Sequence, residues 1–391
     1  MRTARLVVAL LVCAGALLRV NTALAQCQPE WLPQPQGGAL NGVVRALGTY
    51  QRELVIGGSF TQASGLSANR VARWDGQQWA ALGSGVNGAV YAVQEFNRDL
   101  YVGGDFSAAG GEPAGGIARW NGNAWSSLGT TLGPFYDLTI YDNGVVVTSG
   151  GVARWDGASW HGFGAGIDFT STTLAAHEGY LYAGGFETIG FEPIARVARW
   201  DGQFWTNLPM IPAGGVGHQV TSLGVSQDVL HAGGMNTAVA VHQWDGSTWD
   251  PLGTQSMWIN TLALVSFRGD LVAGGTVPNG SQGLARWNGS AWTNLGLGLN
   301  GAVNALLVHD DTLIAGGFFT LAGGLPSPYW ARYGCPCEPD CNNSGSLTIA
   351  DFGCFQSQYV LGDPYADCNA SGTLTIADFG CFQGTYVLGC P

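Results

Sequence analysis

The chain has 391 residues, 62 of them glycine, and a formal net charge of −12. It is too long for one small core, and its acidic balance makes nucleic acid and anionic lipid unfavourable partners because like charges repel. The glycines do not follow the three-residue period of collagen, so we expect them at turns and at close contacts between strands.

The first 25 residues have the pattern of a secretory signal peptide. Two arginines precede an apolar run over residues 6–18, and Ala23-Leu24-Ala25 supplies the small residues of a cleavage site before Gln26. Loss of this leader removes three arginines, so the charge of the mature chain is near −15 (−12 minus 3). A lipid on Cys27 is the alternative, which the preceding glutamine disfavours. No later stretch of 18 apolar residues follows, so we predict an extracellular or cell-surface protein without a membrane span.

A sequence motif recurs along the chain. It consists of an apolar residue followed by Ala-Arg-Trp, then a turn, then a second Trp. Its copies carry the pairs Trp74/Trp79, Trp120/Trp125, Trp155/Trp160, Trp200/Trp205, Trp244/Trp249 and Trp287/Trp292, and a seventh copy ends at Ala331-Arg332-Tyr333. The first aromatic residues are spaced 46, 35, 45, 44, 43 and 46 residues apart. A strand-like repeat of this period predicts an all-β, seven-bladed β-propeller over residues 26–334.

Each repeat is predicted to supply four strands, as in residues 89–93, 100–102, 117–120 and a last strand that carries Trp125. If Asp75 and Gly76 form a two-residue turn, Trp74 pairs with Gln77, and Trp79 is its diagonal neighbour on the same face. We interpret the tryptophan pairs as packing between blades. A ring of sugar-stacking tryptophans is the alternative.

A double glycine follows the second strand of most repeats, as at Gly57-Gly58, and we expect tight packing near the ring centre there. The seventh repeat has no fourth strand of its own. Glu30-Trp31-Leu32 matches the other fourth strands, so the N-terminal segment is predicted to complete the last blade and close the ring. The double glycine and the spaced aromatics resemble those of kelch-like propellers, a resemblance that implies the fold and no particular activity.

A second duplication, with a spacing of 27 residues, occupies the C-terminal region. Each copy places oxygen-bearing residues at positions 1, 3, 5, 9 and 12 of a loop, with glycine at position 6, which is the spacing of a calcium loop. Residues 335–391 resemble a dockerin domain. The resemblance implies two calcium sites, with ligands Asp340, Asn342, Ser344, Ser346, Thr348 and Asp351 in the first and Asp367, Asn369, Ser371, Thr373, Thr375 and Asp378 in the second. Ser346 and Thr373 would bind through their backbone carbonyls.

The tail departs from the dockerin pattern in two ways. Both loops have serine at position 5, so each site holds two carboxylates and we expect weak calcium affinity. Positions 10 and 11 are Ile-Ala in both loops, where many dockerins have polar contacts. We therefore expect a cohesin-like or other surface anchoring protein as the partner, with a surface unlike that of a standard cohesin. A disulfide-held cap with inactive loops is the alternative.

Eight cysteines remain after cleavage, and seven of them lie in the last 57 residues. An even number of cysteines in a secreted chain indicates disulfides. Those at equivalent places in the two copies predict Cys341–Cys354 and Cys368–Cys381. We further predict Cys337–Cys390, and Cys27–Cys335 beside the closing strand. A metal site at Cys335 and Cys337 is the alternative.

No motif marks an active site, since the chain lacks metal-spaced histidines, Gly-x-Ser-x-Gly and a phosphate loop. Propeller sites usually lie at the ring mouth where blades differ, and blades three to five differ most. The catalytic candidates there are Asp137, Asp168 and Glu187, with His177 and His218 as further candidates, and a pair of carboxylates would suit a glycosidase or a lyase. His177-Glu178 and His309-Asp310-Asp311 are expected at solvated hairpin turns.

The leading hypothesis is a secreted, non-catalytic module that binds a carbohydrate or a protein and is anchored by its calcium-binding tail. The alternatives are a polysaccharide-degrading enzyme carried by the tail and a structural component of a surface layer. The loop residues Phe60, Phe106 and Phe319 would either line one face of the propeller or plug their blades.

Overall fold

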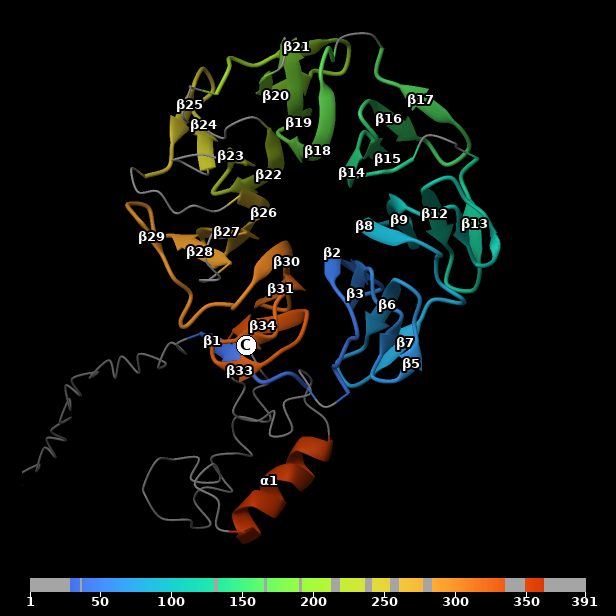
Figure 1. Cartoon of the computed structure of the whole chain (residues 1–391), viewed down its shortest axis with the longest axis vertical. Coiled ribbons are helices and arrows are strands. Elements are labelled where there is room, and N and C mark those ends of the chain that lie inside the picture. Colours follow the sequence, from blue (N-terminus) through green and yellow to red (C-terminus); the bar gives the residue numbers. More distant parts are fainter. Residues whose placement is uncertain are drawn as a thin grey trace, which may run out of the picture.

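Seven four-stranded antiparallel sheets form a ring in the computed structural model (Figure 1). The structure describes residues 29–334, except 36, 130–132, 165–166, 190–191, 212–218, 236–240, 254–259 and 277–282, together with residues 349–361. One strand of each blade lies nearest the centre, and it contacts the inner strands of both neighbouring blades. This is the seven-bladed β-propeller that the repeat predicted.

The blades follow one another along the chain, and each is built outward from its innermost strand. Blade one contains β2 (Val44–Tyr50), β3 (Glu53–Gly58), β6 (Val71–Trp74) and β7 (Trp79–Ala81). Blade two contains β8 (Ala89–Phe96), β9 (Asp99–Asp105), β12 (Ile117–Trp120) and β13 (Trp125–Ser127). Blade three contains β14 (Asp137–Tyr141), β15 (Gly144–Thr148), β16 (Val152–Trp155) and β17 (Trp160–Gly162). Blade four contains β18 (Thr170–His177), β19 (Tyr180–Ile189), β20 (Glu192–Trp200) and β21 (Trp205–Asn207).

The remaining blades keep the same order. Blade five contains β22 (Val220–Ser226), β23 (Val229–Gly234), β24 (Val241–Trp244) and β25 (Trp249–Pro251). Blade six contains β26 (Asn260–Phe267), β27 (Asp270–Thr276), β28 (Leu284–Trp287) and β29 (Trp292–Thr293). Blade seven contains β30 (Ala302–His309), β31 (Thr312–Phe318), β34 (Trp330–Gly334) and β1 (Glu30–Leu32).

The N-terminal strand closes the ring, as the sequence predicted. β1 pairs with β34, with Trp31 opposite Tyr333, so one sheet joins strands from both ends of the propeller. Trp31 is 5% exposed, and its indole N–H donates to the carbonyl of Leu295, in the segment between blades six and seven, at 2.9 Å. Opening the ring would therefore break a strand pairing and expose a buried tryptophan.

The tryptophan pairs share one face, but the predicted register of their hairpin was wrong. Trp74 lies directly opposite Trp79, so four residues form the loop instead of two. The cause is the side chain of Asp75, whose Oδ1 accepts hydrogen bonds from the backbone N–H groups of Gln77 and Gln78 at 2.8 Å each and stabilises the wider loop. The two rings lie with their centroids 5.1 Å apart.

These tryptophans also connect neighbouring blades. In three blades the indole N–H of the second tryptophan donates to a backbone carbonyl that precedes the blade: Trp125 to Leu82 (2.6 Å), Trp160 to Leu128 (2.9 Å) and Trp292 to Leu252 (2.8 Å). The structure thus favours packing between blades over a ring of tryptophans that stack on sugars.

The double glycines allow the inner strands to approach closely. A Cβ atom at Gly57 would lie 2.5 Å from Cγ1 of Val90 in the next blade, and one at Gly58 would lie 2.1 Å from the carbonyl oxygen of Val43. Both distances are too short for any side chain. The predicted role of the glycines in tight central packing is confirmed.

Blades seven, one and two share an ordered loop between their second and third strands, and we call them the clasped blades. Each loop contains a two-residue hairpin pair: β4 (Gln62–Ala63) with β5 (Leu66–Ser67), β10 (Ala108–Ala109) with β11 (Glu112–Pro113), and β32 (Leu321–Ala322) with β33 (Leu325–Pro326). Phe60, Phe106 and Phe319 lie under these loops and are at most 6% exposed. They plug their blades and do not line a face.

An asparagine holds each of these loops in place. Oδ1 of Asn87 accepts hydrogen bonds from the N–H groups of Ser107 and Ala108, and its Nδ2 donates to Oγ of Ser107. Asn41 and Asn300 make the same contacts in blades one and seven. The segments that enter blades three to six contain no asparagine at this place, and we call these the open blades.

Beyond the propeller the structure describes one helix, α1 (Ile349–Leu361), where a helix is expected after the first predicted calcium loop. It includes Asp351, whereas the other eleven predicted calcium ligands lie outside the described residues. Each predicted disulfide also has at least one cysteine outside them. Within the ranges that the structure describes, no helix is long and apolar enough to cross a membrane.

Candidate functional site

Six of the seven inner strands carry a β-bulge at the same place, and the bulged residue lines the central channel. The register shifts in every blade except blade three, where Tyr136 stands just before β14 at the corresponding position. The seven residues at this position are Arg45, Tyr91, Tyr136, Thr172, Thr221, Leu262 and Asn304, and all line one cavity of about 470 Å³. Because this position holds charged, aromatic, polar and apolar residues in different blades, it sets the chemical character of the channel lining.

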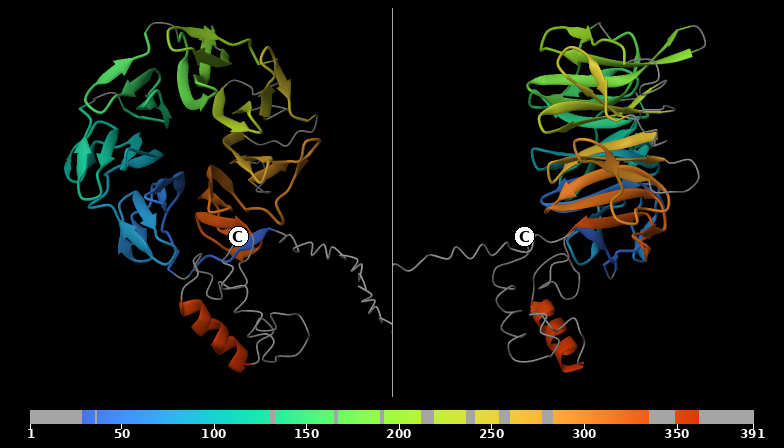
Figure 2. Two further views of the ribbon diagram at one scale, coloured as in Figure 1. Left: turned by 180° about the vertical axis from the view of Figure 1, so that it is seen from behind. Right: turned by 90° about the vertical axis from the view of Figure 1, so that its left-hand side faces the viewer.

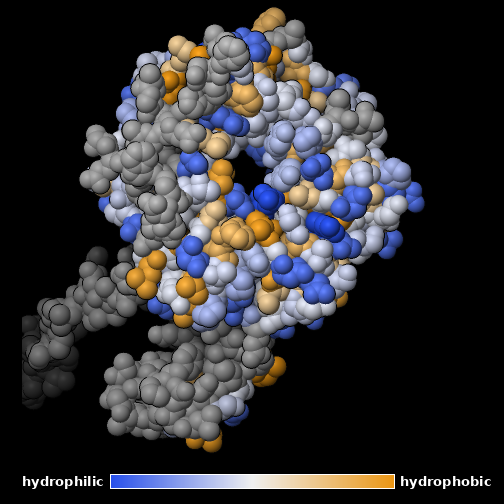
Figure 3. All heavy atoms as spheres, viewed as in Figure 1, coloured by the Kyte–Doolittle hydropathy of each residue, from blue (hydrophilic) through white to orange (hydrophobic). Residues whose placement is uncertain are grey.

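The two ends of the channel differ. The bulges and double glycines lie at one end, which we call the loop face, and the hairpins between first and second strands lie at the other, which we call the turn face. Figure 2 shows the ring edge-on, and Figure 3 shows that it is open at its centre. Glu30 pairs with Gly334, which lies beside Thr312 at a turn-face hairpin, so the propeller's first and last strands both meet the rest of the chain at the turn face.

Three of the channel residues form a continuous stack across blades one to three. The guanidinium carbon of Arg45 lies 5.7 Å from the ring centroid of Tyr91, and the rings of Tyr91 and Tyr136 lie 6.4 Å apart with an interplanar angle of 16°. Nε of Arg45 also donates to Oγ of Ser59 at 3.2 Å, which helps to hold the guanidinium. Tyr136 is 43% exposed, so this stack presents an aromatic surface beside a cation at the channel mouth.

The polar residues on the other side of the channel connect blades. Thr172 donates to the carbonyl of Val220 at 2.9 Å, and Asn304 donates to the carbonyl of Val44 at 2.8 Å. The hydroxyl of Thr221 donates to the carbonyl of Thr261 in the same way. Each of these contacts reaches the next inner strand, so one half of the mouth is aromatic and cationic, and the other half presents hydroxyl and amide groups already bonded to backbone.

Asp137 is the catalytic candidate that lies in the channel wall. Its Oδ2 accepts hydrogen bonds from the N–H of Leu174 at 2.8 Å and the hydroxyl of Thr173 at 3.1 Å, and Oδ1 accepts from the N–H of Leu138 at 2.8 Å. Burial raises the pKa of Asp137 to about 6, although the three donors favour the ionised form. Thr173 in turn accepts a hydrogen bond from the N–H of Leu223, so the carboxylate begins a chain of contacts through blades three, four and five.

The other candidates lie elsewhere. Asp168 is exposed and accepts a hydrogen bond from Asn207 on the outermost strand of blade four, at 3.3 Å. Glu187 forms an ion pair with Arg196 across β19 and β20, at 2.6 Å. Among the described residues that line the cavity, Asp137 is the one carboxylate, so the structure does not bring the three candidates together. His218 lies outside the described residues.

The hairpin histidines lie at the turn face, as expected. His177 ends β18, and its side chain is only 11% exposed, whereas the neighbouring Glu178 is exposed. His309 ends β30 beside Asp310, with 3.4 Å between Nε2 and the nearest carboxylate oxygen. The expectation of solvated turns thus holds for Glu178 and Asp310, whereas the side chains of His177 and His309 are only 11% and 20% exposed.

Arg45, Tyr91 and Tyr136 were not among the predicted site residues. An alignment of the inner strands would have shown a variable position between Val44 and Ala46 and its equivalents. The sequence pattern could not show that the strand bulges there, because regular alternation would assign the side chain to one of the two blade interfaces.

Comparison with known proteins supplies no family. No protein-family model matches the chain, and no curated protein matches it. Among solved structures, a crystal structure of the computationally designed Ika8 protein is similar, with a TM-score of 0.49 and 17% identity over 78% of this chain and 100% of that one. The assignment of the fold therefore depends on the seven sheets themselves.

Proposed function

We propose that this protein is a secreted, non-catalytic binding module that captures a carbohydrate at the loop-face mouth of its propeller. The stack of Arg45, Tyr91 and Tyr136 carries the proposal. Aromatic faces bind the apolar C–H faces of sugar rings, and a neighbouring guanidinium donates to sugar hydroxyl or carboxylate oxygens.

The position of the stack suits a tethered protein. The propeller's first and last strands join the rest of the chain at the turn face, so a tail that leaves from there directs the loop-face mouth outward. Arg45 is the one cation among the cavity-lining residues of an acidic chain. Neutral or acidic polysaccharides therefore suit the mouth better than basic ligands.

The tail supplies the anchor in this proposal. Its two calcium loops order residues 335–391 as a dockerin-like domain, and this domain binds a cohesin-like or other surface anchoring protein. With two carboxylates in each loop, calcium binding is weak and the anchor depends on the calcium concentration. Capture of the tail by its partner should therefore be lost when calcium is chelated.

Retention of the mature chain, residues 26–391, by soluble polysaccharides tests the mouth. Replacing Tyr136 by Ala should weaken retention about fivefold, because about 1 kcal/mol of aromatic contact is lost. Phe204→Ala is the matched control, since Phe204 is an exposed aromatic (69%) in the outer hairpin of blade four. Equal retention of wild type and Tyr136→Ala, or no retention by any polysaccharide, would refute a carbohydrate site at the stack.

A second function rests on Asp137. A carboxyl group with its pKa raised to about 6 in a channel wall is suited to general acid catalysis. The same polysaccharide samples should then be assayed for new reducing or unsaturated ends. Product that disappears in Asp137→Asn would identify a polysaccharide-degrading enzyme, whereas neither product nor retention would leave a structural surface-layer component.

A further inference from the structure

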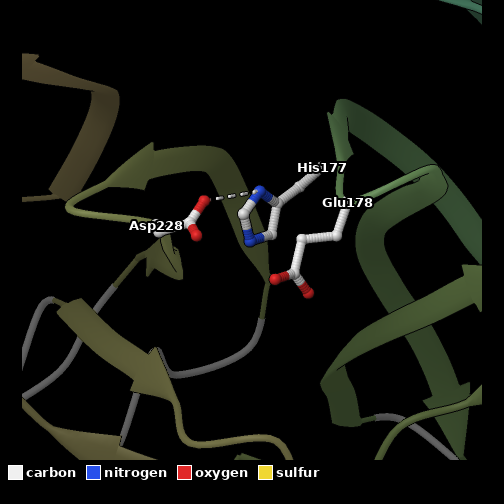
Figure 4. A group of neighbouring side chains, drawn as sticks. All are labelled: His177, Glu178 and Asp228. Carbon is white, nitrogen blue, oxygen red and sulfur yellow. Dashed lines mark ion pairs between the residues drawn. The ribbon is translucent and has the colours of Figure 1, made fainter.

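Three side chains of metal-ligating type meet at the turn face, where blades four and five adjoin. His177 and Glu178 come from the hairpin between β18 and β19, and Asp228 comes from the hairpin between β22 and β23 (Figure 4). One ligand atom of each residue lies within 4.8 Å of the other two. Nδ1 of His177 is 4.0 Å from Oδ1 of Asp228, too far for a hydrogen bond.

The three side chains differ in burial, with the histidine largely buried and the two carboxylates exposed. The side chain of His177 is 11% exposed, whereas the side chain of Asp228 is 84% exposed. Glu178 is also exposed. One fixed nitrogen ligand is thus accompanied by two carboxylates that can rotate toward a common ion.

Some carboxylates at turn-face hairpins have an arginine partner, whereas among the described residues Glu178 and Asp228 have none. Asp311 of blade seven pairs with Arg268 of blade six at 2.5 Å, and Asp142 of blade three pairs with Arg154. Among the described residues, the group within ion-pair distance of Asp228 is His177, and no arginine lies within that distance of Glu178. Two carboxylates so close to each other favour a cation between them.

We propose that His177, Glu178 and Asp228 form a binding site for a divalent transition metal ion that joins blades four and five. One imidazole and two carboxylates suit zinc or manganese, whereas calcium prefers six to eight oxygen ligands. Ligand atoms around tetrahedral zinc lie about 3.4 Å apart, at bond lengths of about 2.0–2.1 Å. Rotation of the two exposed carboxylates closes the remaining distance and leaves the fourth position open to water.

Such a site would cross-link the hairpins of two open blades, which lack the asparagine that holds the loops of the clasped blades. It is separate from the loop-face stack, so its existence does not depend on the proposed carbohydrate binding. It is also separate from the predicted calcium loops, because its nitrogen ligand selects a different class of ion.

Calorimetric titration of zinc into the mature chain tests the site. The chain is first treated with chelator and then saturated with calcium, so that the predicted calcium loops are filled. We expect one zinc ion per chain, with affinity about 100-fold lower in His177→Ala and Asp228→Asn and about tenfold lower in Glu178→Gln, since each variant removes one of three ligands. His309→Ala is the matched control, because His309 holds the equivalent hairpin position in blade seven. The zinc affinity of this variant should equal that of wild type.

Cobalt substitution identifies the donor atoms. Tetrahedral nitrogen and oxygen ligation gives visible absorption without a sulfur-to-cobalt charge-transfer band, and His177→Ala should abolish it. Melting curves in chelator show that the variants fold, and zinc should raise the melting temperature of wild type and His309→Ala but not of His177→Ala. A sulfur band, absence of zinc binding by wild type, or affinity in His177→Ala and Asp228→Asn equal to that of wild type would overturn the proposal.

Discussion

The clasped and open blades use one repeat in two ways. Blades seven, one and two have the same buried phenylalanine, the same small hairpin and the same asparagine contacts, so their loop-face ends are nearly interchangeable. Blades three to six lose the asparagine and acquire polar or titratable groups, among them Asp137, His231 and His242. The comparison teaches that the regular blades stabilise the seam where the ring closes, while the irregular ones take titratable groups into their interiors.

Acid should destabilise the open blades most, and this is the largest effect that we expect. His231 and His242 in blade five are 5% and 1% exposed, and burial lowers the pKa of each to about 4. The unfolded chain, with a histidine pKa near 6.5, takes up protons first as the pH falls. The free energy of unfolding is therefore highest above about pH 6.5. It falls progressively toward pH 4, by about 3 kcal/mol per histidine.

Melting temperatures measured from pH 7 to pH 4 check this prediction. His242→Ala restores the alanine found at the equivalent position of the other blades, such as Ala72 and Ala285, and should remove about half of the acid-induced loss. His309→Ala serves as the control, because His309 is only partly buried. An unchanged acid profile in His242→Ala would show that blade five is not the acid-sensitive region.

Truncation of a blade plug should be the next largest effect. Phe106 is 6% exposed and packs in one cluster with Val86, Ala109 and Trp120. Replacing it by Ala removes a buried ring and leaves a cavity, so the free energy of unfolding should fall by about 3–5 kcal/mol. Denaturant unfolding measures this, and Phe204→Ala, at an exposed aromatic of an open blade, should change it by less than about 0.5 kcal/mol. A loss in Phe106→Ala as small as that in Phe204→Ala would mean that the buried phenylalanine contributes little to the free energy of unfolding.

Loss of one loop-holding asparagine should have the smallest effect of the three on the free energy of unfolding. Asn87→Ala removes the side-chain hydrogen bonds to Ser107 and Ala108, and we expect a loss of about 1 kcal/mol because the site is exposed. Hydrogen exchange at the amides of Ser107 and Ala108 should accelerate while the inner strands remain protected. Asn123→Ala is the control, since Asn123 is exposed and only its backbone N–H is bonded. Unchanged exchange at Ser107 would contradict the clasp.

Much of the fold follows from the spacing of particular residues. The tryptophan period predicted seven blades, and the match between Trp31 and the other fourth-strand tryptophans predicted the closing strand. The hairpin register was wrong because the Asp75 side chain stabilises a four-residue loop, a local hydrogen bond that the dipeptide Asp-Gly does not reveal. The candidate site was only partly predicted, since Asp137 lies in the channel but Asp168 and Glu187 do not.

The sequence by itself determined the number of blades, the closing strand and the packing role of the tryptophans and double glycines. These features repeat, and a repeated residue pattern reports a repeated local environment. Only the tertiary structure decided that Arg45, Tyr91 and Tyr136 stack at one mouth and that His177 and Glu178 meet Asp228. Each of these groups takes residues about 45 to 50 positions apart from successive blades, and their contact depends on the bulges and hairpin turns that set each side chain's direction around the ring.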